Sequence, residues 1–309
     1  MNIKPKRVCF IAIQQEHTVA CEGYHQFSVR TGYDSVLPQR TTDLFAFTAK
    51  KPGTVREVTK LGIIVDYDDG ETQGFELGRR FGSAAGLTIA HNVVTPLKAD
   101  DKFVIGDPIV YNDGFFEPDF FNPKHIVLKN AMEVPTVMWE SAGTHEDSSS
   151  ISTALSDKLS TKITKIKIVE VRFDQSVSQI VQPGQAVTAD DALCIVEDAI
   201  TANNKLFDER SIETLKSLAA QSPRARVKGV VERIEVYYHG DREDMSESLQ
   251  ELSATSDRNF KKRAAAAGKT GYTGKVDGGF RIEGTPLPLD TVAIKFYITS
   301  RVGAGVGDD

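Results

Sequence analysis

The most concentrated group of polar side chains in the sequence follows an apolar stretch that ends at Trp139. Glu146 and Asp147 are adjacent there, after His145 and ahead of a run of serines. Adjacent carboxylates could bind a hard divalent cation, because Mg²⁺ prefers oxygen ligands and keeps several waters beside one or two carboxylates and substrate phosphates. The same acids would also suit the first turn of a helix, where the macrodipole favours negative charge. The residue types alone leave both interpretations open.

Other catalytic signatures are absent from the sequence. The six histidines show no HxxxH or HExxH spacing, which argues against a zinc hydrolase. There is no GxxxxGK[ST], no GxGxxG after a predicted strand and no GxSxG, so a P-loop NTPase, a Rossmann dehydrogenase and an α/β-hydrolase are unsupported. The terminal Gly307-Asp308-Asp309 has the letters of the GDD metal site of single-chain viral polymerases, but we expect a chain end to fray and to hold no metal rigidly.

The elements that must position any such site are mostly strands. Runs rich in β-branched and aromatic residues predict strands at 8–13, 44–49, 62–66, 163–173, 227–238 and 291–298. Glycine, proline and aspartate turn signals separate them. Helical spacing predicts helices at 205–221 and 245–267, and hydroxyl side chains suited to capping predict a short helix at 149–159. We therefore expect a mostly β protein with α insertions, of the α+β class.

Composition limits the class of protein further. The net charge of −6 counts against a free-standing nucleic-acid binder, because phosphate contacts need a basic surface. Basic residues nevertheless cluster at 79–80, 158–167 and 258–263, where a solvated face is the competing interpretation. The three cysteines have no CxxC spacing, so we expect free thiols. No apolar run is long enough to cross a membrane, and we expect a cytoplasmic location.

The last predicted strand and the residues after it resemble a segment of one enzyme family. Residues 292–298 read VAIKFYI, and Ser300-Arg301 and Gly307-Asp308 follow. This pattern resembles the VxVYIxxxRxxxxGDK segment of the β subunit of multisubunit DNA-dependent RNA polymerases, which leads into the active-site motif GDKMAGRHGNKG. The chain stops after Asp309, before the first lysine of that motif. We therefore expect a split or truncated fragment whose missing part lies on a companion polypeptide.

Further matches occur upstream in the family's order. Residues 144–152, THEDSSSIS, resemble YNFEDAIxIS, while 126–130 and 137–139 resemble LALGxNxxVAFMPW. Residues 50–58 resemble AKRxGVV. Residues 181–184 with 192–194 resemble VxPGDILVGK, and 229–237 resemble GTVIDVKVF. These matches cover most of 44–309.

The resemblance implies a hybrid-binding β core with an inserted flap or wall domain. Residues 1–43 would join the upstream β region. Residues 44–174 and 289–309 would form the core that carries the Glu-Asp motif, and residues 175–288 would form the flap- or wall-like insertion.

The resemblance also implies site residues and partners. Glu146 and Asp147 would be the catalytic carboxylates, orienting through water the second Mg²⁺ of a site shared with a β′-like subunit. The partners would be a β C-terminal fragment, β′-like chains, DNA template, RNA and nucleoside triphosphates, with no membrane. We expect DNA-directed RNA polymerase activity, a nucleotidyltransferase activity, only in the complex and none from the chain alone.

One motif departs from the family pattern. Relatives carry RRFxRSNQ near nucleic acid, whereas residues 79–85 here read RRFGSAA. The later arginine and the Asn-Gln pair are missing, so Arg79 and Arg80 are the remaining candidates for nucleic-acid binding in this segment.

Two other interpretations stay open. The strands and turns would also suit a non-enzymatic, β-rich structural or assembly protein of a phage. An independent hydrolase using Glu146 and Asp147 would need a base, a nucleophile or firm metal ligands that the sequence does not offer. Split β subunits are a feature of some large bacteriophages, so we expect a viral chain that acts in the bacterial host cytoplasm, with packaging in the virion as an alternative.

Overall fold

The computed structural model describes residues 20–27, 29, 32–84, 87–129, 132–138, 149–198 and 220–306. The chain is 40% strand and 14% helix, so it is a mostly β protein, and its sheets are antiparallel. Within the described residues no helix is both long and apolar enough to span a membrane.

The strands share β-branched and aromatic composition and are joined mainly by turns. They are β1 (Ala46–Thr48), β2 (Gly53–Val58), β3 (Gly62–Tyr67), β4 (Thr72–Glu76), β5 (Gly78–Ala84), β6 (Leu87–Val94), β7 (Lys102–Phe103), β8 (Pro108–Asn112), β9 (Phe116–Pro118), β10 (Ile126–Leu128), β11 (Thr161–Arg172), β12 (Ser176–Ser178), β13 (Ala186–Val187), β14 (Ile195–Glu197), β15 (Gly229–His239), β16 (Arg281–Ile282), β17 (Thr285–Pro286) and β18 (Thr291–Val302). The helices are α2 (Tyr33–Val36), α3 (Thr153–Lys158) and α5 (Glu247–Ala266), with short 3₁₀ turns at Leu37–Gln39 and Arg242–Asp244.

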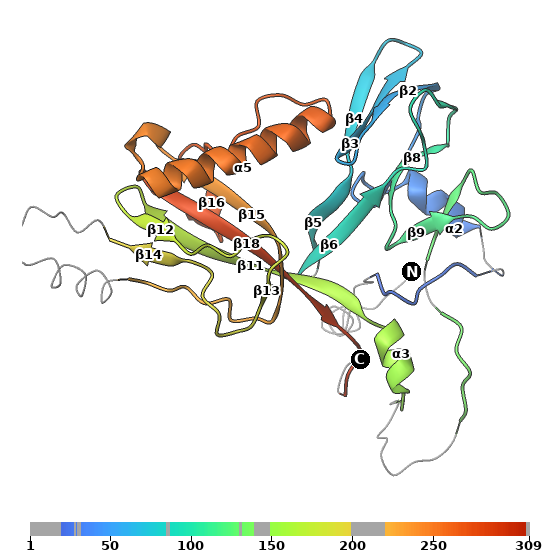
Figure 1. Ribbon diagram of the computed structural model, residues 1–309. Helices are drawn as coiled ribbons and strands as arrows, with labels where there is room; N and C mark the ends of the chain where they lie inside the picture. Colours follow the sequence, from blue (N-terminus) through green and yellow to red (C-terminus); the bar gives the residue numbers. More distant parts are fainter. Residues whose placement is uncertain are drawn as a thin grey trace, which may run out of the picture.

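An eight-stranded sheet runs through the molecule in the order β1-β8-β6-β11-β18-β15-β13, with β5 paired to β6 (Figure 1). Its centre is the antiparallel pair of β11 and β18, which stay in register from Thr161 opposite Val302 to Arg172 opposite Thr291. Strand β18 is paired along both edges, by β11 and by β15, and most of its residues are buried. Residues 292–298 therefore lie in a central strand.

A second, four-stranded sheet has the order β4-β3-β2-β7. Alternate residues of β2 and β3 point inward, as the pleat of a strand requires, and Val55, Ile63 and Val65 are fully buried. They pack in one apolar cluster with Phe103 and Ile109. This sheet forms the upper lobe at the right of Figure 1.

Helix α5 lies along β15 and ends against the four-stranded sheet (Figure 1). Its apolar face is narrow, with Leu249 and Phe260 buried, and it also buries polar side chains. One of these, Ser256, accepts a hydrogen bond from the Val236 backbone amide of β15 at 3.0 Å. Helix α5 thereby covers a part of β15 that β13 does not reach, and such free strand edges otherwise invite further pairing.

The predicted helices and strands can be compared directly with these elements. Helix α5 confirms the prediction at 245–267, and α3 confirms the short helix at 149–159, with the Ser152 hydroxyl accepting the Leu155 amide at 3.2 Å as its N-cap. Strands β1, β3, β11, β15 and β18 confirm five predicted strands. The strand predicted at 8–13 lies outside the described residues. So does the predicted helix at 205–221, except for residues 220–221, where the Gln221 backbone pairs with Val196.

The first predicted boundary between the core and the insertion lies between residues 174 and 175. In the structure β15, from the predicted insertion, pairs with β18 of the predicted core. One apolar cluster likewise combines Val171 and Ile294 with Val196 and Leu249. The two parts therefore share a sheet and a hydrophobic core, while the boundary itself stays a prediction.

Candidate functional site

The carboxylates predicted to carry the chemistry, Glu146 and Asp147, lie in 139–148, outside the described residues. Among the residues that the structure does describe, no group of three or more histidine, cysteine or acidic side chains is placed to hold a metal ion. The predicted magnesium contact stays a prediction. The structure describes the segments on either side of the pair, 132–138 and the residues from 149 onward.

Arg79 and Arg80, the predicted nucleic-acid contacts, are both in β5. The Arg79 guanidinium pairs with Glu232 at 2.9 Å, and the Arg80 guanidinium pairs with Asp43 at 3.0 Å. Both side chains are partly exposed, and each forms an ion pair with an acidic residue of the same chain. Their contact with nucleic acid also stays a prediction.

The Glu-Asp segment leads into α3 and then into β11. The helix is short: Ser152 is its N-cap and Leu159 its C-cap. The chain then continues through Ser160 into the strand. Since β11 pairs with β18 over its whole length, the end of α3 lies beside the end of β18 (Figure 1). Two segments far apart in sequence, α3 and the C-terminal end of β18, are thus neighbours.

Arg301 connects the end of α3 with the end of β18, and we call this region, residues 156–160 and 301–304, the junction. Its guanidinium donates to the Ser160 hydroxyl at 2.8 Å and to the Asp157 backbone carbonyl at 2.8 Å, and it pairs with Glu22 at 3.0 Å. The Ser156 hydroxyl also donates to the Ala304 carbonyl at 2.5 Å. The helix after the Glu-Asp pair is therefore fastened to the residues that follow β18.

The segment around Gly23 completes the junction. The backbone amides of Glu22 and Gly23 donate to the carbonyls of Ser160 and Lys158 at 3.0 and 2.8 Å. A Cβ atom at position 23 would lie 2.8 Å from the Lys158 Cβ and 3.0 Å from the Lys158 carbonyl oxygen, so glycine suits this close approach.

A cavity of about 370 Å³ opens at this junction. Its charged lining residues come from four separate parts of the chain, and the complete lining is Glu22, Gly23, His25, Met132, Glu133, Asp157, Lys158 and Arg301. Lysine and arginine are the side chains that bind phosphate oxygens, the arginine through several donors in a fixed plane. The cavity therefore offers cations beside carboxylates, between the end of α3 and the end of β18.

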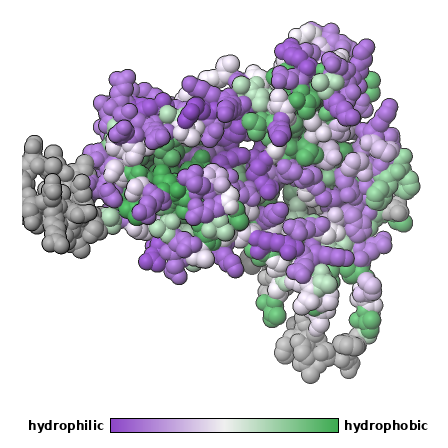
Figure 2. Space-filling view, viewed as in Figure 1, coloured by the Kyte–Doolittle hydropathy of each residue, from purple (hydrophilic) through white to green (hydrophobic). Residues whose placement is uncertain are grey.

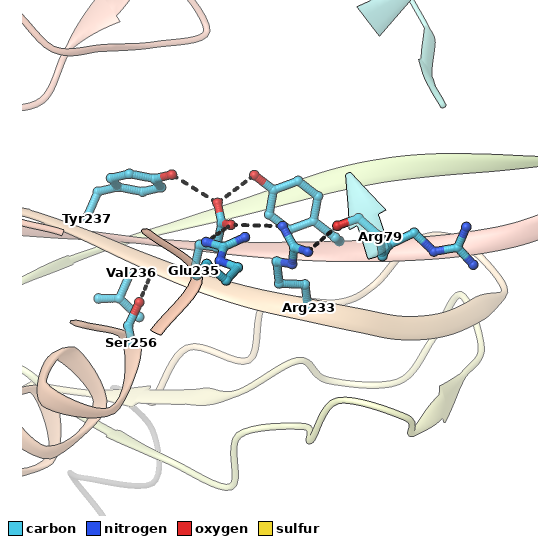
Figure 3. Close-up of polar contacts among 8 residues, drawn as sticks. Arg79, Arg233, Glu235, Val236, Tyr237 and Ser256 are labelled. Atoms are coloured by element: carbon cyan, nitrogen blue, oxygen red, sulfur yellow. Dashed lines mark hydrogen bonds and ion pairs between the residues drawn. The ribbon is translucent and has the colours of Figure 1, made fainter. Parts of the chain in front are cut away.

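A second polar centre surrounds Glu235 on β15, a residue only 6% exposed. Its carboxylate accepts hydrogen bonds from the hydroxyls of Tyr237 and Tyr297, both at 2.9 Å, and it pairs with Arg263 at 2.9 Å and Arg233 at 3.4 Å. Figure 3 shows the Tyr237 and Arg233 side chains converging on this carboxylate. The buried charge is therefore paired and hydrogen-bonded, as burial requires.

The same network ties β15 to β5. The Arg233 guanidinium donates to the Arg79 carbonyl (Figure 3). It also lies 4.9 Å from the Phe81 ring, which stacks on Tyr297 with 4.5 Å between the ring centroids. These contacts join two strands of the large sheet that are not paired with each other, and β5 follows β4 of the four-stranded sheet.

The surroundings of Glu235 determine its protonation. Burial acts to raise its pKa, but Arg263, the two tyrosine hydroxyls and Arg233 together lower the pKa below its ordinary value. Burial and the Glu235 charge raise the pKa values of Tyr237 and Tyr297 well above the usual tyrosine range. The carboxylate is consequently ionised and the phenols stay protonated, an arrangement that stabilises the fold.

Neither the Glu235 network nor the contacts of Arg301 with α3 were predicted from the sequence. Charged residues at alternate positions 233 and 235, inside an otherwise apolar strand, are the available signal, because alternation places them on one face. Arg263 and Tyr297 come from other elements, and the sequence does not indicate that they meet Glu235.

Comparison with known proteins adds no relative: no family model matches the chain, and no curated protein matches it.

Proposed function

We propose that this chain is part of the β subunit of a multisubunit DNA-directed RNA polymerase and contributes to its nucleotide-addition site. One observation carries the proposal. Helix α3, which follows the Glu-Asp segment, is fastened to residues 301–304, which follow the VAIKFYI strand. In the polymerase family the corresponding segments both line the active centre.

The chemistry fits the residues available. In nucleotide addition the RNA 3′ hydroxyl attacks the α-phosphate of the incoming triphosphate in line, and the protein mainly positions the reactants and stabilises charge. Magnesium would supply charge stabilisation at the attacking and leaving oxygens. Glu146 and Asp147 are carboxylates of the kind that hold this metal through water, while Lys158 and Arg301 of the junction cavity are cations suited to phosphate oxygens.

The proposed architecture assigns the described strands to two parts. The pair of β11 and β18 would belong to the hybrid-binding core, and β15 with α5 would belong to the flap- or wall-like insertion. The proposed partners are a β′-like chain, a chain carrying the rest of β, the DNA template, RNA and nucleoside triphosphates.

The first test identifies the partners. A tagged chain recovered from its native source should bring down polymerase polypeptides, identified by mass spectrometry, and the complex should extend RNA on a DNA template. Recovery of no β′-like polypeptide would overturn the proposal in favour of the structural-protein alternative.

The second test concerns the reaction. In the reconstituted complex, Glu146→Ala combined with Asp147→Ala should slow nucleotide addition on the order of 100-fold, because oriented charge at a transfer site is worth that much. A matched control, Glu247→Ala with Glu251→Ala, removes two acids from α5 and should leave the rate unchanged. If the first variant assembles and extends RNA at the normal rate, the carboxylates have only the helix-capping role.

A further inference from the structure

Strand β11 is open along most of one edge. One edge pairs with β18 over the whole strand, whereas on the other edge only Ile163 and Thr164 have partners, in β6. Strand β6 begins at Leu87, so its pairing with β11 stops after Thr164. Among the described residues, no strand pairs with this second edge from Lys165 onward.

The backbone contacts of Arg172 show which residues face the open edge. Its amide donates to the Gln175 side-chain oxygen at 2.8 Å, and its carbonyl accepts from the Gln175 amide at 3.0 Å. Both groups therefore point away from β18. Successive residues of an antiparallel strand direct their backbone groups to opposite edges, so Ile166, Ile168 and Glu170 also present an amide and a carbonyl to the open edge. In the part of the chain that the structure describes, these groups have no hydrogen-bond partner on that edge.

Both faces of this stretch are covered, so only its edge is open. Val169 and Val171 belong to the apolar cluster that includes Leu249 of α5. On the opposite face, Ile168 packs against the cluster of Ile282 beside the β16–β17 hairpin. The surface over α5 is largely hydrophilic in Figure 2. The unsatisfied groups of this part of the sheet are therefore main-chain donors and acceptors rather than an apolar face.

Protection against unwanted pairing explains only part of this edge. Proteins guard open edges with short strands, prolines, bulges or charged side chains. Strand β11 is 12 residues long, contains no proline and keeps an unbroken register with β18. Its charges, Lys165, Lys167 and Glu170, have no ion-pair partner among the described residues. They alternate with apolar residues, a pattern that a strand of matching charge and apolar positions would complement.

We propose that the open edge of β11 is a docking site for an extended segment of a partner polypeptide, which adds to the sheet as an antiparallel strand. The partner backbone exchanges hydrogen bonds with Ile166, Ile168 and Glu170. Side chains directly opposite each other in such a pair interact, and opposite charges there are favourable. The partner segment therefore carries acidic residues opposite Lys165 and Lys167, a basic residue opposite Glu170 and apolar residues at the other positions.

A second copy of this chain fits the edge less well. In a symmetric antiparallel pairing centred on Ile168, Lys165 would lie opposite Val171 and Lys167 opposite Val169, so neither lysine would gain an acidic neighbour. The proposed function assigns no partner to this edge. The inference does not depend on polymerase activity, because it rests on the backbone and charges of β11.

The test uses the full chain and a fluorescein-labelled peptide, Val-Lys-Val-Ile-Glu-Val-Glu, whose residues would lie opposite 171 to 165 in that order. Binding is followed by fluorescence anisotropy. N-methylation of the isoleucine amide, which faces Ile168, should abolish binding, whereas N-methylation of the first glutamate amide, which faces away from β11, should leave the affinity unchanged. No binding at about 1 mM peptide, or an equal effect of the two methylations, would overturn the proposal.

A charge exchange tests the orientation of the added strand. Lys165→Glu/Lys167→Glu should bind this peptide about tenfold more weakly, because two favourable cross-strand pairs become unfavourable. It should instead prefer the peptide Val-Lys-Val-Ile-Lys-Val-Lys. The control Lys98→Glu/Lys124→Glu reverses the same charge at exposed positions elsewhere and should keep the original affinity.

Far-UV circular dichroism checks that each variant is folded. Equal loss of affinity in the two double variants would show non-specific attraction and contradict the docking site. Light scattering of the chain alone gives its oligomeric state. A dimer that the peptide dissociates would show that a second copy occupies the edge, and the assignment to a different polypeptide would be wrong.

Discussion

The Glu235 network allows a quantitative prediction of stability. Glu235→Gln keeps the size of the side chain but removes the charge that faces Arg233 and Arg263, whose side chains are only 22% and 19% exposed. Removing one partner of a buried ion pair costs about 3–5 kcal/mol, because the other charge stays buried without compensation. Both arginines reach some water and the amide still accepts a tyrosine hydroxyl, so we expect the lower end, about 3 kcal/mol.

The assay is urea denaturation at neutral pH, followed by far-UV circular dichroism. Glu170→Gln is the control, because Glu170 is an exposed acid on β11 of the same sheet and should change the free energy of unfolding very little. Tyr297→Phe deletes one hydroxyl donor and should cost about 1–2 kcal/mol. If Glu235→Gln costs no more than the control, the network is worth no more than a surface ion pair and the reasoning is wrong.

Acid should reproduce part of this effect. The folded-state pKa of Glu235 is lowered, so the unfolded chain binds the proton more readily. The contribution is therefore present above the ordinary glutamate pKa and is lost as the pH falls through the folded-state value. In Glu235→Gln this component of acid destabilisation should disappear.

Two further predictions concern close packing and pH. Gly74→Ala should lower the free energy of unfolding by about 1–3 kcal/mol, because its methyl group would lie 2.0 Å from the Ala267 carbonyl oxygen, whereas Gly278→Ala, with no atom closer than 3.7 Å, should be nearly neutral in the same urea assay. His91 is buried, and burial, then Arg80 and Arg79, lower its pKa from 6.5 to about 4, so its contribution is complete above pH 6.5 and is lost as the pH falls from there toward 4. Urea titrations over this range should show a slope of up to about 1.4 kcal/mol per pH unit from this residue. The slope should be shallower in His91→Asn, and an unchanged slope would contradict the assignment.

Local sequence patterns are sufficient to predict the main helices and strands. Alternation in VAIKFYI predicts a strand, and β18 is one. Spaced apolar residues among charges predict α5, and hydroxyls before an apolar turn predict the capped helix α3. These signals are local, because strand and helix periodicity and capping depend on residues within a few positions of one another.

Short matches in a fixed order also suggest the family. They predict Glu146 and Asp147 as catalytic carboxylates and Arg79 and Arg80 as nucleic-acid contacts. Periodicity says which face of a strand is apolar but not which strand is its neighbour. Only the tertiary structure decided that β11 and β18 pair in full, which brings Arg301 to the end of α3. It likewise decided that residues of β15, α5 and β18 converge on the Glu235 carboxylate, since contacts between distant segments depend on how the sheets and the helix pack together.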